Sequence, residues 1–354
     1  MPRVLACGSG SIGHLAPLVA IYRAILATAP STIVALSCGT RPEESKYLHI
    51  EGVPWTTLPQ PQCSWLFPQT FLQSYRAACH LLNAFQPDAI LSRGGAISVP
   101  LCLAAARRRI PITLHESDAV MGRATRCTAR WARTITTGFP PESYPNIFHS
   151  RIIATGNPVR PEITRGSREE GLRITQFSGE KPILLILGGS QGAQVINEAT
   201  LALLPELTQL CDIIHITGPG KLKPNTYNLT PPHSYWSTEF AHAELPHLYA
   251  LTTFALSRAG AGVLSELTAN GIPPIIVPLR GLAHDHQWHN ANFFARRHAC
   301  ILLEQESLPQ QLIPEIRRMI DHPTVCKELK KNLLSLHHPD AARHITEIVL
   351  KNIA

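Results

Sequence analysis

Two glycine-rich turns in this sequence have the composition of phosphate-binding loops. Residues 8–13 follow the apolar run at 4–7, and residues 188–192 follow the apolar run at 183–187. A glycine turn between a buried strand and a helix lets backbone N–H groups and the helix N-terminus approach phosphate oxygens. The pattern therefore predicts a site for a phosphate-bearing ligand after each of these strands. The second half has a further turn of this kind at 258–262, and a diphosphate could be held between 188–192 and 258–262 without a metal ion.

His14 stands where the first glycine turn passes into a helix. An imidazole is neutral near pH 7 and can accept a proton, so His14 is the first candidate for a general base. The structural alternative is a histidine that bonds backbone groups at a helix N-terminus. Glu116 and Asp118 are the alternative bases, because a carboxylate at a strand end can occupy the same position.

The chain repeats one structural pattern in both halves. Residues 91–96 read LSRGGA and residues 256–261 read LSRAGA, and apolar strands alternate with helices around both segments. This alternation predicts an α/β protein with two Rossmann-like parallel sheets covered by helices, linked near residues 156–158. Expected strands include 32–36, 88–91 and 112–114, and expected helices include 97–108, 122–133, 195–204 and 341–353.

Length and composition limit the possible classes of protein. The 354 residues are 44% hydrophobic and 16% charged, which fits two folded domains rather than a disordered chain. The N-terminus lacks the pattern of a signal peptide, and the longest nearly apolar stretch, residues 96–106, is shorter than the roughly 20 residues of a membrane span. The nine cysteines form no Cys-x-x-Cys pair, so we expect buried thiols in a reducing cytoplasm rather than disulfides or a zinc site.

The positive charge of the chain lies in its first half. The formal net charge is +7, with 15 basic and 7 acidic residues over 1–160 but 17 and 18 over 161–354. This excess predicts an anionic partner, either phosphates or an anionic membrane surface; nucleic acid is not expected, because zinc-finger spacing and the RNP pattern are absent. The densest group comprises Arg107, Arg108, Arg109, Arg123, Arg126, Arg130 and Arg133, of which the last four would share one face of the expected helix 122–133.

A dinucleotide enzyme is the main competing interpretation. Gly8, Gly10 and Gly13 match the G-x-G-x-x-G fingerprint, but the next expected strand has no acidic residue for a ribose until Glu43. Arg41 could hold a 2′-phosphate, so an NADP-dependent oxidoreductase remains an alternative.

Six short segments follow one another along the chain: 9–14 (SGSIGH), 115–118 (HESD), 156–160 (GNPVR), 188–193 (GGSQGA), 258–266 (RAGAGVLSE) and 287–291 (QWHNA). Together, and in this order, they resemble the MurG family, which transfers N-acetylglucosamine from UDP-N-acetylglucosamine (UDP-GlcNAc) to lipid I and so forms lipid II for peptidoglycan. Two departures stand out: Ile12 replaces a glycine of the first loop, and Asp118 replaces an asparagine of the family's His-Glu-Gln-Asn segment.

The resemblance implies a GT-B fold, with two Rossmann-like domains facing each other across a cleft. Residues 1–158 would bind the acceptor and dock on the membrane, residues 159–336 would bind UDP-GlcNAc, and 337–354 would form a helix that packs back on the first domain. The implied reaction is an inverting displacement by the C4 hydroxyl of muramic acid. Related alternatives are a transferase with another lipid acceptor such as diacylglycerol, a UDP-GlcNAc 2-epimerase, and a non-catalytic scaffold.

The resemblance also implies roles for individual residues. His14 or Glu116 would be the base, Glu266 would hold the ribose, Arg160 and the backbone near Ala241 the uracil, and Gln287 the sugar hydroxyls. No cofactor is implied, and the run His284, Asp285, His286 and His289 is a poor template for a metal. The remaining implied contacts with substrate are Ser11, Ile12, Gly13, Asp118, Ser190, Ala261, Gly262, Val263, Leu264, Ser265 and Asn290.

A lipid acceptor implies contact with a membrane. An aromatic-rich stretch in the basic half of the chain is the candidate surface, although packing against the sheet is the alternative explanation. We expect peripheral binding to the anionic cytoplasmic face of the inner membrane, with other enzymes of cell-wall synthesis as further partners. The stretch contains Trp65, Leu66, Phe67, Phe71, Leu72 and Tyr75.

Overall fold

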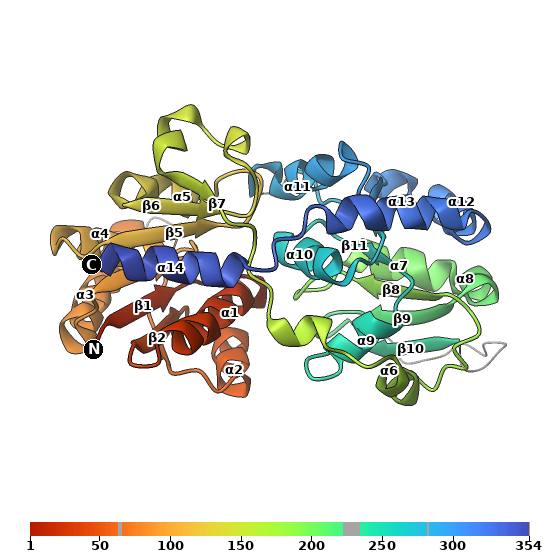
Figure 1. The fold of residues 1–354 in the computed structure, drawn as a ribbon, viewed down its shortest axis with the longest axis horizontal. Helices are drawn as coiled ribbons and strands as arrows, with labels where there is room; N and C mark the ends of the chain where they lie inside the picture. The colour runs from red at the N-terminus through yellow and green to blue at the C-terminus, as the bar shows by residue number, and fades with distance from the viewer. Residues whose placement is uncertain (63–65, 222–233, 282, 354) are drawn as a thin grey trace. The chain divides into compact units, whose positions relative to one another are not determined.

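The protein is described from a computed structural model, over residues 1–62, 66–221, 234–281 and 283–353. It forms two compact units, one of residues 1–160 with 338–354 and the other of residues 161–337 (Figure 1). These boundaries lie within two residues of the expected ones at 158/159 and 336/337. Trp65 lies outside the described residues.

The N-terminal unit is built on a parallel sheet in the order β3-β2-β1-β4-β5-β6-β7. The chain runs outward from β1 in one direction and, after β3, returns to place β4 on the other side of β1, so the strand order reverses between β1 and β4. The strands are β1 (Arg3–Cys7), β2 (Ile33–Cys38), β3 (Trp55–Thr57), β4 (Ala89–Ser92), β5 (Ile112–Glu116), β6 (Thr134–Thr137) and β7 (Ile152–Ala154). The helices are α1 (Ile12–Thr28), α2 (Pro42–Ile50), α3 (Phe67–Phe85), α4 (Ser98–Arg107), α5 (Arg123–Thr128) and α14 (Ala341–Ile353), with 3-10 turns η1 (Ala129–Trp131), η2 (Pro141–Ser143) and η3 (Asn146–Arg151).

The C-terminal unit repeats this plan with a parallel sheet in the order β10-β9-β8-β11-β12-β13, and its strand order reverses between β8 and β11. Its strands are β8 (Ile183–Leu187), β9 (Asp212–Ile216), β10 (Tyr235–Thr238), β11 (Phe254–Ser257), β12 (Pro274–Ile276) and β13 (Ile301–Leu302). Its helices are α6 (Arg168–Thr175), α7 (Gln194–Ala202), α8 (Leu204–Leu210), α9 (Leu245–Leu251), α10 (Ala261–Asn270), α11 (His286–Ala295), α12 (Leu308–Asp321) and α13 (Pro323–Leu334), with 3-10 turns η4 (Pro161–Thr164), η5 (Ala283–Asp285) and η6 (Gln305–Ser307).

The last helix of the chain belongs to the N-terminal unit. In Figure 1, α14 runs beside α1, and buried Ile345 and Val349 join the core cluster formed by β1, β2, β4 and α1. Asn352 extends this packing by donating to Thr113 Oγ1 at 3.0 Å. The apolar residues that recur at helical spacing over 341–353 therefore form the helix face that packs against the N-terminal unit.

The prediction of one helix over 122–133 is wrong, because the helix in the structure is shorter. The helix α5 ends at Thr128, whose hydroxyl bonds back to Ala124 O at 2.9 Å, and a 3-10 turn follows. Arg133 lies just before β6 and donates to Asn352 O at 3.2 Å, so the four arginines do not share one helical face. The chain leaves the α-helix at this 3-10 turn, η1, and only residues 132 and 133 separate the turn from β6.

None of the helices formed by the described residues combines the length and apolar character that crossing a bilayer requires.

Candidate functional site

Two glycine turns meet at the carboxyl edge of the N-terminal sheet. The turn after β1 and the turn after β4 lie on neighbouring strands where the order of the sheet reverses, the usual ligand position in such sheets. Their backbones approach closely: a Cβ added to Gly95 would stand 2.5 Å from Ser9 O, and Gly10 has a φ of +114°. These positions therefore require glycine, and the turns leave backbone groups close to a ligand at this edge.

His14 lies in the first turn of α1, as the sequence predicted. Its N–H donates to Ser11 O at 3.0 Å, and Ser11 is the extended N-cap residue of the helix. Ser11, Gly13 and His14 are half-buried and lie at the start of the helix together. Ile12 packs against the core of the unit, so its side chain need not block the loop where the family has glycine.

The structure adds Glu44 to this site, which sequence analysis missed. The Glu44 carboxylate is 1% exposed and accepts from Gly10 N and Gly39 N, both at 2.7 Å. Arg41 Nη1 donates to Gly10 O at 2.6 Å. Arg41, the side chain that might have held a 2′-phosphate, is thus bonded to the glycine turn, which disfavours the NADP interpretation.

Changing Glu44 to glutamine should therefore destabilise the N-terminal unit. An amide has one acceptor oxygen, so one glycine N–H would lose its buried partner, at a cost of about 1–3 kcal/mol in the free energy of unfolding. Urea denaturation of Glu44→Gln measures this. The neighbouring Glu43 is exposed, and Glu43→Gln should unfold like the wild type; equal stabilities of the two variants would contradict the role given to Glu44.

Glu116 ends β5 and is buried among hydrogen-bond donors. Its carboxylate accepts from Gly122 N at 3.0 Å and Asp118 N at 3.2 Å. Burial, and to a smaller extent the Asp118 carboxylate, raise the pKa of Glu116 to about 7, although bonds from Gly122 N–H and the Thr125 hydroxyl oppose the rise. Both oxygens are engaged in holding the 116–122 turn, so this geometry suits a positioning role better than that of a base.

Asn157 connects two of the predicted motifs, its own at 156–160 and the one at 115–118. Asn157 Oδ1 lies 3.1 Å from His115 Nε2, and Asn157 Nδ2 donates to Ser117 O at 3.0 Å. Burial, aided by the charge of Arg93, lowers the pKa of His115 to about 3, so this histidine is a neutral structural residue. The Tyr144 hydroxyl donates to Asp118 O at 2.9 Å, which fixes the backbone of the half-buried Asp118.

Arg160 lies in the N-terminal unit rather than with the predicted donor domain. Its Nη1 pairs with Glu51 Oε1 at 2.6 Å, and Glu51 also accepts from Arg23 at 2.7 Å. Arg160 is 9% exposed. Its contact with uracil stays a prediction, and the ion pair gives it a structural function within the N-terminal unit.

The C-terminal unit carries the second glycine turn at its own point of strand reversal. Ser190 is half-buried in the turn between β8 and α7. Gly189 has a φ of +79°, and a Cβ on Gly192 would collide with the backbone of Thr217. Lys221 Nζ donates to Gln191 O at 2.7 Å, so a lysine holds the turn through one of its carbonyl groups.

The helix α10 begins beside this turn, directly after β11, with Gly260 as its N-cap residue. The N–H groups of its first turn, at 261–263, have no partner within a helix and form the positive end of the helix dipole. Buried Asn290 donates to Ala259 O at 3.0 Å and so supports the loop before α10. The Ser265 hydroxyl bonds to Ala261 O at 2.7 Å, which stiffens this first turn.

Three other predicted contacts lie in the same unit. Glu266 accepts from the hydroxyl of buried Tyr249 at 2.8 Å, which orients the carboxylate; sequence analysis missed Tyr249, because it lies 17 residues away on α9. Gln287 Oε1 accepts from Leu279 N at 3.0 Å, and Ala241 is buried after β10. Among residues 1–62, 66–221, 234–281 and 283–353, no three His, Cys, Asp or Glu side chains converge as metal ligands.

Comparisons with known proteins identify the family of this chain. The family model of the glycosyltransferase family 28 N-terminal domain matches residues 4–137, and that of the family 28 C-terminal domain matches residues 183–345. The UDP-N-acetylglucosamine--N-acetylmuramyl-(pentapeptide) pyrophosphoryl-undecaprenol N-acetylglucosamine transferase 2 of Bacillus cereus is 31% identical over 90% of this chain and 92% of its own length. The corresponding transferase of Shouchella clausii is 38% identical over 68% of this chain and 67% of its own length. The chain belongs to the MurG family.

Solved structures agree on the fold. MurG of Acinetobacter baumannii, 22% identical, matches with a TM-score of 0.75 over 99% of this chain and all of that one. A UDP-GlcNAc 2-epimerase of Neisseria meningitidis, solved with UDP-GlcNAc bound, is 16% identical. It matches with a TM-score of 0.67 over 99% of this chain and all of that one. The protein therefore has the GT-B fold, and within the MurG family it is a UDP-sugar glycosyltransferase.

Proposed function

We propose that this protein transfers N-acetylglucosamine from UDP-GlcNAc to the C4 hydroxyl of the muramic acid of lipid I, forming lipid II. The observation that carries the proposal is the position of the motifs at 9–14, 188–193 and 258–266, which follow β1, β8 and β11 at the carboxyl edge of the sheets where the strand order reverses. The relatives at 31% and 38% identity carry this activity in their names, which supports the same substrates here.

The proposed acceptor side uses the N-terminal unit. The acceptor oxygen forms its bond to the anomeric carbon of the donor sugar as the bond from that carbon to the UDP oxygen breaks, which inverts the configuration. His14 takes the proton of the attacking hydroxyl, because it is the imidazole at the start of α1 beside the glycine turn. Ser11, Ile12, Gly13 and Asp118 line the acceptor, and Glu116 holds the loop that carries Asp118.

The proposed donor side uses the C-terminal unit. Negative charge builds on UDP as the glycosidic bond breaks, and the N–H groups of α10 at 261–263, with Ser190, offset it, while Leu264 N–H is bonded to Gly260 O within the helix. Glu266, oriented by Tyr249, accepts from the ribose hydroxyls, and Gln287 bonds the sugar. These contacts stabilise the negative charge that develops on UDP, and the proposed reaction includes no step on a metal or a cofactor.

The experiment that tests this function varies the acceptor. UDP release from UDP-GlcNAc should require a lipid I analogue and should not occur with diacylglycerol. UDP release with diacylglycerol alone would instead support the lipid-acceptor alternative. Formation of UDP-N-acetylmannosamine without any acceptor would support an epimerase, a possibility that the fold alone leaves open.

We also propose that the N-terminal unit docks on an anionic membrane, at the cytoplasmic face where UDP-GlcNAc is made. The buried side of α3 consists of Ser74, Ala78 and Leu82, whereas Phe67 and Leu72 are 45% and 46% exposed. Part of the aromatic stretch is therefore exposed rather than buried against other elements. The docking patch comprises Phe67, Phe71, Leu72, Tyr75, Arg107 and Arg108, with Arg107 Nη1 bonded to Tyr75 Oη at 3.0 Å.

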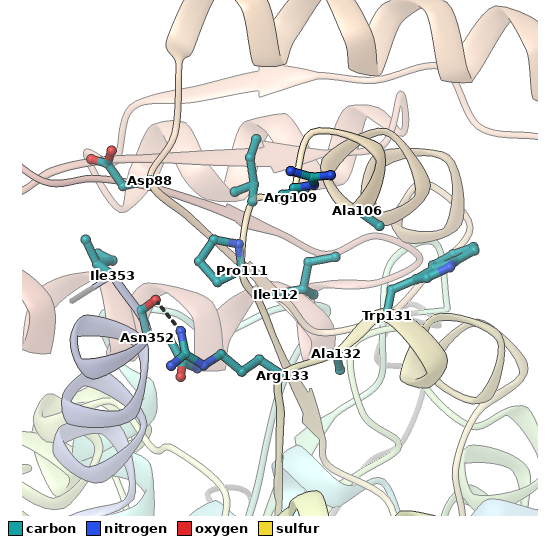
Figure 2. Close-up of a pocket in the computed structure, with 11 residues that line it drawn as sticks. Asp88, Ala106, Arg109, Pro111, Ile112, Trp131, Ala132, Arg133, Asn352 and Ile353 are labelled. Atoms are coloured by element: carbon teal, nitrogen blue, oxygen red, sulfur yellow. Dashed lines mark hydrogen bonds between the residues drawn. The ribbon is translucent and has the colours of Figure 1, made fainter.

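A hollow beside this patch adds positive charge. It measures about 590 Å³ and lies at the amino ends of β4, β5 and β6, opposite to the edge that carries His14. Figure 2 shows Arg109, Trp131 and Arg133 around it, with Arg133 bonded to Asn352. Apolar side chains with adjacent arginines are the combination that interfacial binding requires.

Removing the apolar part of the patch should weaken membrane binding. In Phe67→Ser/Leu72→Ser, the affinity for phosphatidylglycerol vesicles should fall at least about tenfold, since each inserted side chain contributes about 1.5–3 kcal/mol. Sedimentation with phosphatidylglycerol and phosphatidylcholine vesicles measures this. Leu334, 42% exposed in the C-terminal unit, supplies the control Leu334→Ser. Equal binding of the wild type to both vesicle types would contradict the docking proposal.

A further inference from the structure

Two neighbouring residues after β12 contact two neighbouring residues in the first turn of α11. Leu279 N–H donates to Gln287 Oε1 at 3.0 Å. The guanidinium of Arg280 lies over the ring of Trp288, with Cζ 3.8 Å from the ring centroid, which is the geometry of a cation–π contact. Arg280 Nη1 also pairs with Glu304 Oε1 at 3.0 Å, just after β13. These contacts hold the chain that leaves β12 against the start of α11.

The backbone just before α11 has an unfavourable conformation. His284 and Asp285 both have a left-handed φ, of +59° and +53°, although neither is glycine. Such a conformation persists only where surrounding contacts hold it. Gly281 N–H supplies one of these contacts by donating to Asp285 Oδ1 at 2.6 Å. The Leu279 hydrogen bond and the stacked Arg280 supply two more, because they attach the same segment to the helix that follows.

The hydrogen bond from Leu279 also decides how the Gln287 amide is turned. A backbone N–H can only donate, so the amide oxygen must be the atom that faces it. The amide nitrogen, a donor, is then the group by which Gln287 can meet a ligand. The same helix lies beside the loop that precedes α10, since Asn290 donates to Ala259 O at 3.0 Å. The first turn of α11 is therefore placed, with a fixed amide, near the N-terminus of α10.

We propose that Arg280 and Trp288 are positioning residues, which hold the Gln287 amide in one orientation for the sugar of the donor. The stacked pair keeps Leu279 beside Gln287, and Leu279 N–H keeps the amide from turning. The contact of Gln287 with the sugar rests on the proposed function, whereas the attachment of residues 279–281 to α11 does not. Arg280 and Trp288 thus serve the sugar of UDP-GlcNAc rather than the nucleotide.

Calorimetric titration with UDP-GlcNAc and with UDP separates the sugar from the nucleotide. In Arg280→Met the affinity for UDP-GlcNAc should fall about three- to tenfold, while the affinity for UDP stays at that of the wild type. Arg280→Lys keeps the cation and should retain most of the affinity for UDP-GlcNAc. The matched control is Arg297→Met, because Arg297 lies over Phe293 of the same helix, with Cζ 3.6 Å from the ring centroid. This control should bind both ligands normally.

A double-mutant cycle tests whether Arg280 acts through Gln287. Gln287→Ala removes the amide, so adding Arg280→Met to it should cause no further loss of UDP-GlcNAc affinity. Additive losses would overturn the positioning role. So would an Arg280→Met variant that binds UDP-GlcNAc like Arg297→Met, or one that loses affinity for UDP and UDP-GlcNAc to the same extent.

Trp288→Leu repeats the test from the other side of the stacked pair. It removes the ring and should reproduce the loss of UDP-GlcNAc affinity seen in Arg280→Met, and it carries the test if Arg280→Met does not fold. Wild-type affinity for UDP-GlcNAc in Trp288→Leu would overturn the role of the pair. A wild type that binds UDP-GlcNAc but transfers no sugar refutes the proposed function instead, while the cycle still measures the coupling between positions 280 and 287.

Discussion

In His14→Ala, kcat for transfer to a lipid I analogue is expected to fall about 100- to 10,000-fold, while UDP-GlcNAc binds as it does to the wild type. The loss has a simple cause: the acceptor hydroxyl is a poor nucleophile while it keeps its proton, and His14 is the imidazole at the start of α1 beside the glycine turn. Single-turnover kinetics give the rate, and calorimetry gives the donor affinity.

The control for this variant is His344→Ala, which removes an exposed histidine of α14 in the same unit. It should transfer sugar at the rate of the wild type. Undiminished turnover in His14→Ala would remove His14 as the base and transfer the role to Glu116 or Asp118. Loss of donor binding in His14→Ala would instead indicate damage to the fold.

The second large effect concerns the donor. Changing Glu266 to alanine should weaken UDP binding about 10- to 100-fold, because a charged acceptor of two ribose hydrogen bonds contributes about 1.5–3 kcal/mol. The acceptor KM should not change, since Glu266 belongs to the C-terminal unit. Calorimetric titration with UDP measures the effect.

Two further variants sharpen this prediction. Tyr249→Phe removes the 2.8 Å bond that orients Glu266 but keeps the carboxylate, so its UDP affinity should fall less than that of Glu266→Ala. Glu328→Ala removes an exposed carboxylate of α13 and should bind UDP normally. If Glu266→Ala bound UDP as tightly as Glu328→Ala, Glu266 would not hold the ribose.

Local sequence was sufficient to predict the parts of the site that lie on one segment. Glycine turns after apolar runs predicted the ends of β1 and β8, and the repeated LSR segment predicted β4 and β11, the strands across each reversal. Such features depend on backbone conformation and strand burial, which a short stretch of sequence specifies. For the same reason the apolar period at 341–353 predicted the bounds of α14.

The residues that sequence analysis missed act through contacts distant in the chain. Glu44 reaches Gly10 across 34 residues, and Tyr249 reaches Glu266 across 17. No local pattern distinguishes a buried acid such as Glu44 from its exposed neighbour Glu43. The expected helix at 122–133 failed for a related reason, because arginine spacing does not show where β6 must begin.

The most direct test of the account is the analysis of the product formed from UDP-GlcNAc labelled in the sugar, a lipid I analogue and the wild-type protein with EDTA present. The account predicts that the label enters the lipid fraction as a disaccharide joined through the C4 oxygen of muramic acid, with inverted anomeric configuration. Label recovered only as free sugar or unchanged donor, despite measured UDP-GlcNAc binding, would contradict it.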